Sequence, residues 1–337
     1  MMAWHFGPDT GCPFWLAWAG KQGWDPREEV QGFDDLARFP NFDGEWLRFE
    51  QPEQWVPQAF VGRPYNIFET GGTTGMPKQR IGWDDYKVDY ESFGDTLSDD
   101  EFPRGRNWLM MGPTGPRRLR LSIEHLANYR GGSCYFVDLD PRWVKRLIVN
   151  GDLDQAKAYM EHVIDQAVMI LEHRDVAAVF TTPRLLESLG EKVSIPDAGI
   201  KGVFCGGTEM SPQNVRFLVE EVLEGRVAFK PVYGNTLMGL AHSKPLVAQD
   251  NFSVTYYAPQ PRAVTRVVDP NRTDQVVDYD TWGRVELTTM TKEFFMPCFL
   301  ERDEAIRRGP ADGYAWDGVG EVRPFGASET KIVEGVY

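Results

Sequence analysis

Residues 176–181 read VAAVFT, a short apolar run between the polar residues Asp175 and Thr182. Such a run predicts a β-strand that is buried on both faces. The preceding residues 154–173 predict an amphipathic helix, because four apolar side chains recur there at helical spacing. Those side chains are Tyr159, Val163, Ala167 and Ile170. A buried strand that follows a helix favours a parallel sheet covered by helices.

The same alternation of strands and helices continues on both sides of this run. Strands are expected at residues 133–137, 202–205 and 227–232, and a short helix is expected to begin at Pro183. Another helix should begin at Ser211-Pro212, since Ser suits the N-cap and Pro suits the first turn, where its missing N–H costs nothing. The pattern predicts an α/β fold with helices on both faces of a parallel sheet.

The two ends of the chain differ from this middle part. After residue 250, alternating runs at 263–268 and 284–289 are separated by Pro, Asn and Asp turns, which predicts a smaller and more antiparallel β subdomain. The first sixty residues are rich in Trp, Phe, Pro and Gly, which predicts an irregular or short-helical wrapping segment. We interpret its aromatic side chains as packing, with the wall of an aromatic ligand pocket as the alternative.

The composition excludes some functions. With 36 Lys+Arg against 50 Asp+Glu, the formal charge is −14, which disfavours nucleic acid and anionic membrane surfaces as partners. The cysteines stand singly, without the C-x-x-C spacing of structural zinc sites, and are expected to be buried or incidental thiols. They are Cys12, Cys134, Cys205 and Cys298. The N-terminus lacks the features of a signal peptide and no apolar run reaches roughly 18 residues, so we expect a cytoplasmic protein.

The segment most informative about chemistry is ETGGTTGMPK at residues 69–78. Adjacent glycines let backbone N–H groups turn toward an anion, Thr hydroxyls add donors, and Lys78 supplies a positive charge. It is not a Walker A loop, because its glycines do not fit that spacing and Lys78 follows Pro77. From the residues alone, a phosphate cradle and a plain turn between two strands both remain open.

This loop resembles the signature [ST]-[SG]-G-T-T-G-x-P-K of the acyl-adenylate-forming enzymes, the superfamily of acyl-CoA synthetases, peptide-synthetase adenylation domains and luciferases. Three further segments resemble that superfamily in the same order: FCGGTEMS at 204–211, VYGNTLMG at 232–239, and GRVELTTMTKE at 283–293. The third, with Met296-Pro297 and Arg302-Asp303 after it, is similar to the phenylacetate-CoA ligase branch. The resemblance spans residues 69–337.

The resemblance implies the large N-terminal domain of that fold, a parallel α/β subdomain with a smaller β subdomain. It divides the chain into four parts. They are a wrapping segment at 1–60, an α/β AMP-binding core at 61–250, a β subdomain at 251–326 and a hinge remnant at 327–337.

The resemblance also implies a nucleotide site. The ATP triphosphate would lie on Thr70, Gly71, Gly72, Thr73, Thr74, Gly75 and Lys78. The adenine would be bordered by Gly206, Gly207, Thr208, Tyr233, Gly234 and Asn235, with Tyr233 stacked on it. Thr236 would hydrogen-bond the α-phosphate and Asp303 would hold the ribose hydroxyls, so Lys78 and Thr236 are the catalytic candidates. The acyl group would contact Met111, Gly112, His125 and Gly206.

Several positions depart from the family pattern. Leu237 stands where the motif has a Glu that lies near Mg²⁺, so the metal ligands stay open, with Glu209 or Glu69 as substitutes. One Arg of the R-x-R-D pattern is Leu300. Three arginines at 117, 118 and 120 could meet a carboxylate or solvate a turn, and we favour the turn.

The end of the chain is the largest departure. Residues 328–337 resemble the hinge that precedes a mobile C-terminal lid, and the sequence given stops there. The lid carries the catalytic lysine of the family. This lidless arrangement resembles adenylating proteins of aromatic pathways, among them one from phenazine-antibiotic synthesis and the adenylating components of aryl-carboxylate reductases.

The leading hypothesis is an acid-AMP ligase that uses ATP and Mg²⁺ to convert an aromatic carboxylic acid into an aryl-AMP with release of pyrophosphate. A partner reductase or transferase would consume the product. Two alternatives stay open: a nucleotide- or aromatic-acid-binding protein or scaffold with little turnover, and a CoA ligase whose lid comes from another chain. The sequence leaves the oligomeric state open, with a homodimer among the options.

Overall fold

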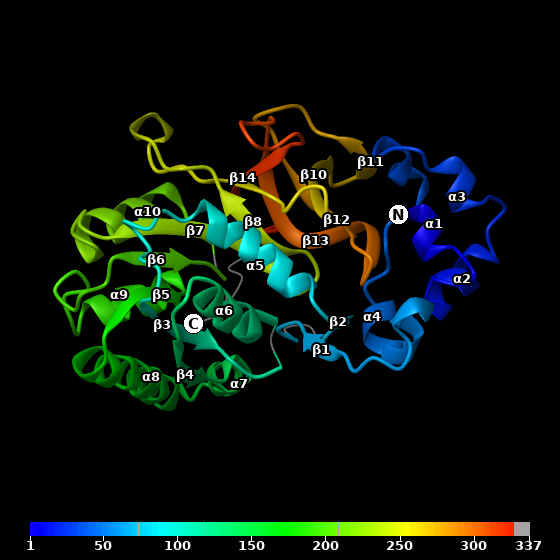
Figure 1. Ribbon diagram of the computed structural model, residues 1–337. Helices are drawn as coiled ribbons and strands as arrows, with labels where there is room; N and C mark the ends of the chain where they lie inside the picture. The colour runs from blue at the N-terminus through cyan, green and yellow to red at the C-terminus, as the bar shows by residue number, and fades with distance from the viewer. Residues whose placement is uncertain (73–74, 117, 208, 327–337) are drawn as a thin grey trace. The chain divides into compact units, whose positions relative to one another are not determined.

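The structure, a computed structural model, describes residues 1–72, 75–116, 118–207 and 209–326 (Figure 1). The chain forms two compact units. Unit 1 comprises Met1–Tyr86, Thr236–Gly239 and Tyr257–Val319. Unit 2 comprises Lys87–Asn235, Leu240–Tyr256 and Gly320–Tyr337. The division of the chain into four parts stays a prediction.

Unit 2 contains the parallel sheet expected from the sequence. Its strands lie in the order β4-β3-β5-β6-β7, and each neighbouring pair is parallel. Their bounds are β3 (Asn107–Pro113), β4 (Cys134–Leu139), β5 (Val176–Thr181), β6 (Gly202–Cys205) and β7 (Ala228–Asn235). Most residues of β8 (Gly239–Ser243), β9 (Thr255–Tyr257) and β14 (Gly318–Pro324) extend the sheet beyond β7. The predicted α/β class and the strand at 176–181 are confirmed.

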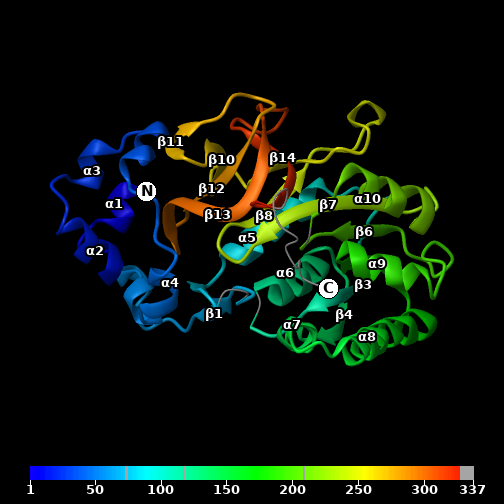
Figure 2. The ribbon, with the colours of Figure 1, turned by 180° about the vertical axis from the view of Figure 1, so that it is seen from behind.

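Helices connect these parallel strands, as the sequence pattern predicts. They are α6 (Arg118–Tyr129), α7 (Pro141–Val149), α8 (Leu153–His173), α9 (Pro183–Gly190) and α10 (Pro212–Phe217), the last continued by the π-helical segment η4 (Leu218–Val222). A further helix, α5 (Asp85–Thr96), precedes β3. Two opposite views show α7 and α8 side by side near β4, and α8 contacts β3 and β4 (Figure 2). The Ser211 hydroxyl accepts a hydrogen bond from the Asn214 N–H at 3.2 Å, which confirms the predicted N-cap of α10.

The core of unit 2 is aromatic at its centre. Phe204 of β6 lies 4.7 Å from Phe180 of β5 and 6.0 Å from Trp108 of β3, measured between ring centroids. Phe102 stacks on Trp108 at 5.8 Å. All four side chains are buried. These ring contacts join three neighbouring strands, so they fix the strand ends that carry the expected adenine residues.

Unit 1 contains an antiparallel sheet in the order β11-β10-β12-β13. The strands are β10 (Ala263–Asp269), β11 (Arg272–Val276), β12 (Trp282–Met290) and β13 (Phe295–Arg308). The register places Thr265 opposite Leu287. The expected runs at 263–268 and 284–289 are therefore paired antiparallel strands, which confirms the predicted β subdomain character. A separate antiparallel hairpin joins β1 (Asn66–Glu69) and β2 (Gln79–Gly82).

The first sixty residues form short helical segments, as expected from their composition. These are α1 (Met2–His5), α2 (Pro13–Ala19), α3 (Pro26–Glu29), η1 (Asp34–Arg38), α4 (Trp46–Phe49), η2 (Pro52–Trp55) and η3 (Gln58–Phe60); a later short turn is η5 (Ala248–Asp250). Trp15 is only 2% exposed, lies 5.1 Å from the Phe295 ring and donates its indole N–H to the Phe295 carbonyl at 3.1 Å. Phe6 and Phe39 pack on the same two rings. These aromatic residues are packing, which confirms the interpretation favoured from the sequence.

The cysteines and helices agree with two further expectations. All four thiols are free; Cys12, Cys205 and Cys298 are buried, and Cys134 is partly buried. Within the part of the chain that the structure describes, every helix is too short or too polar to cross a bilayer.

Candidate functional site

The glycine-rich loop closes the β1–β2 hairpin of unit 1. Its two ends are joined by two hydrogen bonds, from Thr70 N to Lys78 O and from Lys78 N to Thr70 Oγ1, both at 3.0 Å. Gly72 has φ +67° and Gly75 has φ +121°, a backbone region that L side chains rarely adopt. The glycines therefore permit the sharp turns that the sequence pattern requires. Thr73 and Thr74 lie outside the described residues.

Lys78 is held in a confined place at the end of this loop. Its Nζ lies 4.6 Å from the centre of the Phe299 ring, a cation–π distance. Gly44 lies against its side chain, since a Cβ there would be 2.7 Å from Lys78 Cε. Burial lowers the pKa of the Lys78 amine from its ordinary value, while the charge of Glu301 opposes that shift. The side chain is thus positioned by packing from two other segments of unit 1.

Two further expected nucleotide residues belong to unit 1. The Thr236 hydroxyl donates to the Glu69 carbonyl at 3.3 Å, which places Thr236 at the base of the loop. Asp303 lies on β13 two residues after Glu301, and the charges of Asp303 and Lys78 both act on Glu301. Unit 1 therefore contains the loop, Lys78, Thr236 and Asp303.

Glu301 is a residue of this site that the sequence analysis did not select. Burial, followed by the charge of Asp303, raises its pKa to about 7, although Lys78 opposes the shift. Its backbone carbonyl accepts a hydrogen bond from Arg284 Nε at 2.8 Å. Its position in Leu300-Glu301-Arg302-Asp303 could have indicated it as a site residue, because an acidic residue stands there at position x of the R-x-R-D pattern. The site thus contains a carboxyl group that titrates near neutral pH.

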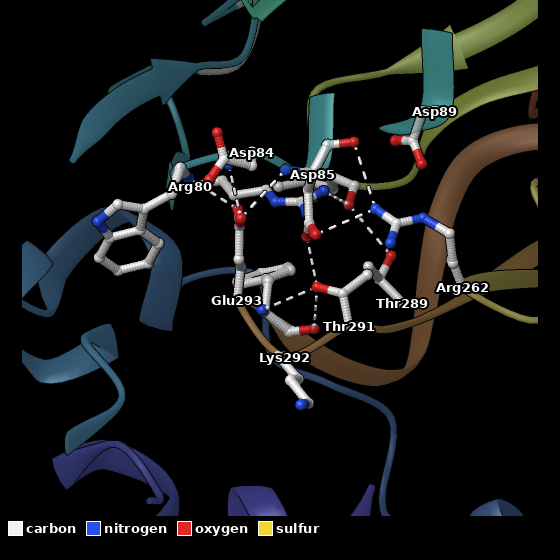
Figure 3. A network of polar contacts seen from close by, with 12 residues as sticks. Arg80, Asp84, Asp85, Asp89, Arg262, Thr289, Thr291, Lys292 and Glu293 are labelled. Atoms are coloured by element: carbon white, nitrogen blue, oxygen red, sulfur yellow. Dashed lines mark hydrogen bonds and ion pairs between the residues drawn. The ribbon is translucent and has the colours of Figure 1, made fainter. Parts of the chain in front are cut away.

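A buried network of charges lies directly after the loop (Figure 3). The Asp85 carboxylate pairs with Arg80 at 2.9 Å and with Arg262 at 3.0 Å, and it also accepts from the Thr291 hydroxyl. Glu293 accepts backbone N–H bonds from residues 83, 84 and 85 at 2.7, 2.6 and 3.1 Å. The network therefore fixes the chain between β2 and α5. Thr291 and Glu293 lie in the segment at 283–293 that carries the resemblance, but no member of the network was selected as a site residue from the sequence.

The expected adenine residues lie in unit 2, where β6 and β7 end. Gly206 follows β6 and donates its N–H to the Thr181 carbonyl at 3.2 Å. A Cβ at Gly206 would be 2.8 Å from Val232 Cγ2, so only glycine fits there. Gly207 has φ +98°. Tyr233, near the end of β7 with Gly234 and Asn235, lies 5.9 Å from Tyr256 between ring centroids. Carboxyl ends of parallel strands are where ligands bind in open α/β sheets.

The neighbouring position 208 lies outside the described residues, so the part expected of Thr208 stays a prediction.

The expected acyl-binding residues occupy different environments within unit 2. Met111 is fully buried in β3, and a Cβ at Gly112 would be 3.2 Å from the Phe180 ring. His125 lies on α6, where its Nε2 is 2.7 Å from Glu91 Oε1. Met111 and Gly112 therefore belong to a tightly packed strand end, while His125 is engaged with a carboxylate on α5.

Arg118 corrects the interpretation of the basic cluster. The sequence favoured a solvated turn, but Arg118 is only 4% exposed and pairs with the buried Asp89. It lies on the same helical face as Ser122 and Leu126, which are also buried. The turn of α6 thus points this arginine inward, where burial requires a carboxylate partner.

The described residues do not fit a metal ion held by the expected motif. Leu237 is 2% exposed, and its carbonyl accepts from Arg80 Nη1 at 2.5 Å and from Thr289 Oγ1 at 3.1 Å. Over residues 1–72, 75–116, 118–207 and 209–326, no group of three or more His, Cys, Asp or Glu side chains is arranged to hold a metal.

Comparison with solved structures identifies the fold. The chain is similar to 2-hydroxyisobutyryl-CoA ligase in complex with 2-HIB-AMP and CoA, with a TM-score of 0.64 and 17% identity, over 96% of this chain. It is also similar to O-succinylbenzoate coenzyme A synthetase (MenE) from Bacillus subtilis in complex with AMP, with a TM-score of 0.50 and 13% identity, over 77% of this chain. The chain therefore shares its fold with the hydroxyisobutyryl-CoA ligase.

This chain matches only part of the length of each of these two proteins. The chain spans 65% of the length of the hydroxyisobutyryl-CoA ligase and 49% of the length of MenE. No protein-family model matches the sequence, and no curated protein matches it.

Proposed function

We propose that the protein activates a carboxylic acid with ATP, forming an acyl-AMP and releasing pyrophosphate. The observation that carries the proposal lies in unit 1, where Thr236 contacts Glu69 at the base of the loop whose ends Thr70 and Lys78 join, and where the charges of Lys78 and Asp303 both act on Glu301. The fold supports it, because the hydroxyisobutyryl-CoA ligase that shares this fold holds an acyl-AMP.

Each residue has a defined part in the proposed reaction. A carboxylate oxygen attacks the α-phosphorus in line, the new P–O bond forms, and the bond to pyrophosphate breaks. Lys78 and the loop amides stabilise the negative charge on the departing pyrophosphate, and Thr236 donates to the α-phosphate. Asp303 accepts from the ribose hydroxyls, while Gly206, Gly207 and Tyr233 border the adenine. Catalysis is then positioning and charge stabilisation rather than covalent chemistry.

We further propose that the acid is aromatic. Gly112 lies against the Phe180 ring, and Met111 beside it is a polarisable side chain; aromatic and polarisable side chains of this kind suit a flat apolar guest. The acyl-AMP would pass to a partner such as a reductase or transferase in the cytoplasm. An acyl-AMP is an electrophile that reacts with hydride donors and with nucleophiles.

Two other functions have specific support. A nucleotide- or aromatic-acid-binding protein with little turnover is favoured by Leu237, because no carboxylate stands at the position next to Thr236. A CoA ligase that receives its lid from another chain is favoured by the fold, which it shares with a ligase that binds CoA. Added CoA would raise turnover only if the protein is such a CoA ligase.

The test is pyrophosphate release by the purified chain with Mg²⁺, ATP and a panel of aryl acids that includes fused-ring acids. We expect release that depends on the acid. Lys78→Ala should lower kcat/KM by about 100-fold or more, the usual effect of removing one donor to developing charge. Lys21→Ala, an exposed lysine of unit 1, is the matched control and should leave the rate unchanged. Full pyrophosphate release by Lys78→Ala would refute the assignment.

A further inference from the structure

Arg80 is an unusual residue for its place in the fold. It lies on β2, two residues after Lys78, and is only 2% exposed. Arginine is rarely buried unless its charge is paired, because desolvation of an unpaired guanidinium is costly. Its cationic carbon lies 4.7 Å from the centre of the Phe294 ring, so an aromatic face covers one side. The two terminal nitrogens of the guanidinium make polar contacts with two different segments of unit 1.

In one direction the guanidinium is anchored. Arg80 Nη2 donates to Asp85 Oδ2 at 2.9 Å. Asp85 is itself held by Arg262 through Oδ1 at 3.0 Å and by the Thr291 hydroxyl, and its backbone N–H donates to Glu293 (Figure 3). The Asp85 carboxylate therefore cannot rotate freely, and it fixes the orientation of the planar arginine group.

In the other direction the guanidinium holds the backbone that follows β7. Arg80 Nη1 donates to the Leu237 carbonyl at 2.5 Å and lies 3.5 Å from the Thr236 carbonyl. Thr289 donates to the same Leu237 carbonyl from β12 at 3.1 Å. The Thr236 hydroxyl in turn contacts the Glu69 carbonyl at the base of the loop. Arg80 thus links the strand that leaves the phosphate loop to the segment that carries Thr236.

We propose that Arg80 is a positioning residue of the nucleotide site, which sets the place of the Thr236 hydroxyl relative to the phosphate loop. This inference rests on the proposed function, in which Thr236 meets the α-phosphate. Arg80 acts through the backbone of residues 236 and 237 and touches no substrate. The expected consequence is that Arg80 controls the affinity for ATP and the rate of adenylation, and has little effect on the affinity for the acid.

The fork of the guanidinium is what makes this role specific. Its two terminal nitrogens reach Asp85 and the Leu237 carbonyl at the same time. A lysine carries the same charge on a single nitrogen, so it can keep the ion pair with Asp85 or the bond to the carbonyl, but not both. Arg80→Lys therefore retains a cation in the buried network and breaks the link between Asp85 and the segment that carries Thr236.

The experiment compares Arg80→Lys with Arg262→Lys. Arg262 makes the other ion pair with Asp85, at 3.0 Å, so the Arg262→Lys variant controls for weakening of the network itself. We expect Arg80→Lys to raise the KM for ATP and the dissociation constant for ATP by about 10-fold or more, the usual effect of losing a hydrogen bond to a charged group. The KM for the acid should change less than twofold. Arg262→Lys should lower the melting temperature and raise the KM for ATP less than Arg80→Lys does.

Thr289→Val supplies a second readout, because it removes the other donor to the Leu237 carbonyl. It should raise the KM for ATP in the same direction, and its effect should be less than additive with that of Arg80→Lys. A lower melting temperature of Arg80→Lys with an unchanged KM for ATP would show a merely structural role and overturn the inference. An equal rise in KM for Arg262→Lys would overturn it as well.

Calorimetric titration with ATP separates this inference from the proposed function. If the wild-type chain releases no pyrophosphate but binds ATP, and Arg80→Lys binds it more weakly, the positioning role stands and adenylation is refuted. If the wild-type chain releases pyrophosphate and Arg80→Lys binds ATP equally well, adenylation stands and the positioning role is refuted. A wild-type chain that binds no ATP would overturn both.

Discussion

Glu293→Gln tests whether a single carboxylate holds the chain between the β1–β2 hairpin and α5. Glu293 is 7% exposed and accepts three backbone N–H groups. Two of them, from Asp84 and Asp85, bond to Oε1, and the third, from Trp83, bonds to Oε2. Glutamine has one oxygen and one amide nitrogen. It can keep the pair of bonds on its oxygen, but its NH₂ group then faces the Trp83 N–H, a donor against a donor.

The expected loss of stability follows from these contacts. Leaving one buried N–H without an acceptor costs about 1–3 kcal/mol, and changing two charge-assisted bonds to neutral ones costs about 1 kcal/mol each. A gain partly offsets this loss. Burial and the nearby charge of Asp85 raise the pKa of Glu293, so its charged form is already disfavoured in this place. The net loss should be about 2–3 kcal/mol.

Urea denaturation followed by circular dichroism and tryptophan fluorescence measures this change, and hydrogen exchange of a peptide that covers residues 80–90 shows where it occurs. Glu293→Gln should shift the midpoint down and speed exchange in that peptide. Glu28→Gln, which removes the same charge from an exposed position on α3, should stay within about 0.5 kcal/mol of wild type. A Glu293→Gln variant with wild-type stability and wild-type protection would refute the account of the three bonds.

Two further predictions concern the strand end of unit 2 and the titration of Glu301. Gly206→Ala should destabilise the protein by about 1–3 kcal/mol, because its Cβ would lie 2.8 Å from Val232 Cγ2 and 2.9 Å from the Val232 carbonyl oxygen; an unchanged melting temperature would contradict this packing. Because the pKa of Glu301 is raised from 4.5 to about 7 mainly by burial, the folded chain keeps a proton that the unfolded chain has released between these values. The contribution of Glu301 to stability should therefore fall as the pH rises from about 4.5 to 7, and the difference in unfolding free energy between wild type and Glu301→Gln should follow that fall. A difference that does not vary with pH would contradict the raised pKa.

The candidate site shows which functional residues could be predicted from patterns in the sequence. The loop from Thr70 to Lys78 was found in the sequence because glycines with positive φ and a terminal lysine leave a local pattern. Thr236 and Asp303 came only from their order in a resemblance, and the structure places Thr236 at the base of the loop. Arg118 was misjudged, although its spacing from Ser122 and Leu126 matched one buried helical face. That signal was present in the sequence and was outweighed by the neighbouring arginines.

The sequence by itself determined the elements whose formation is local. The strand at 176–181, the capped start of α10 at Ser211 and the antiparallel runs after residue 250 were predicted, because apolar periodicity and turn residues report burial within a few residues. Only the tertiary structure decided the network of Arg80, Asp85 and Glu293. Arg80 meets a carbonyl 157 positions away, and Glu293 meets the N–H of Asp85 at a separation of 208 positions. A contact between residues so far apart in the sequence leaves no periodic signal. The packing of the sheet brings the two partners together, and the residues next to each of them along the chain do not report it.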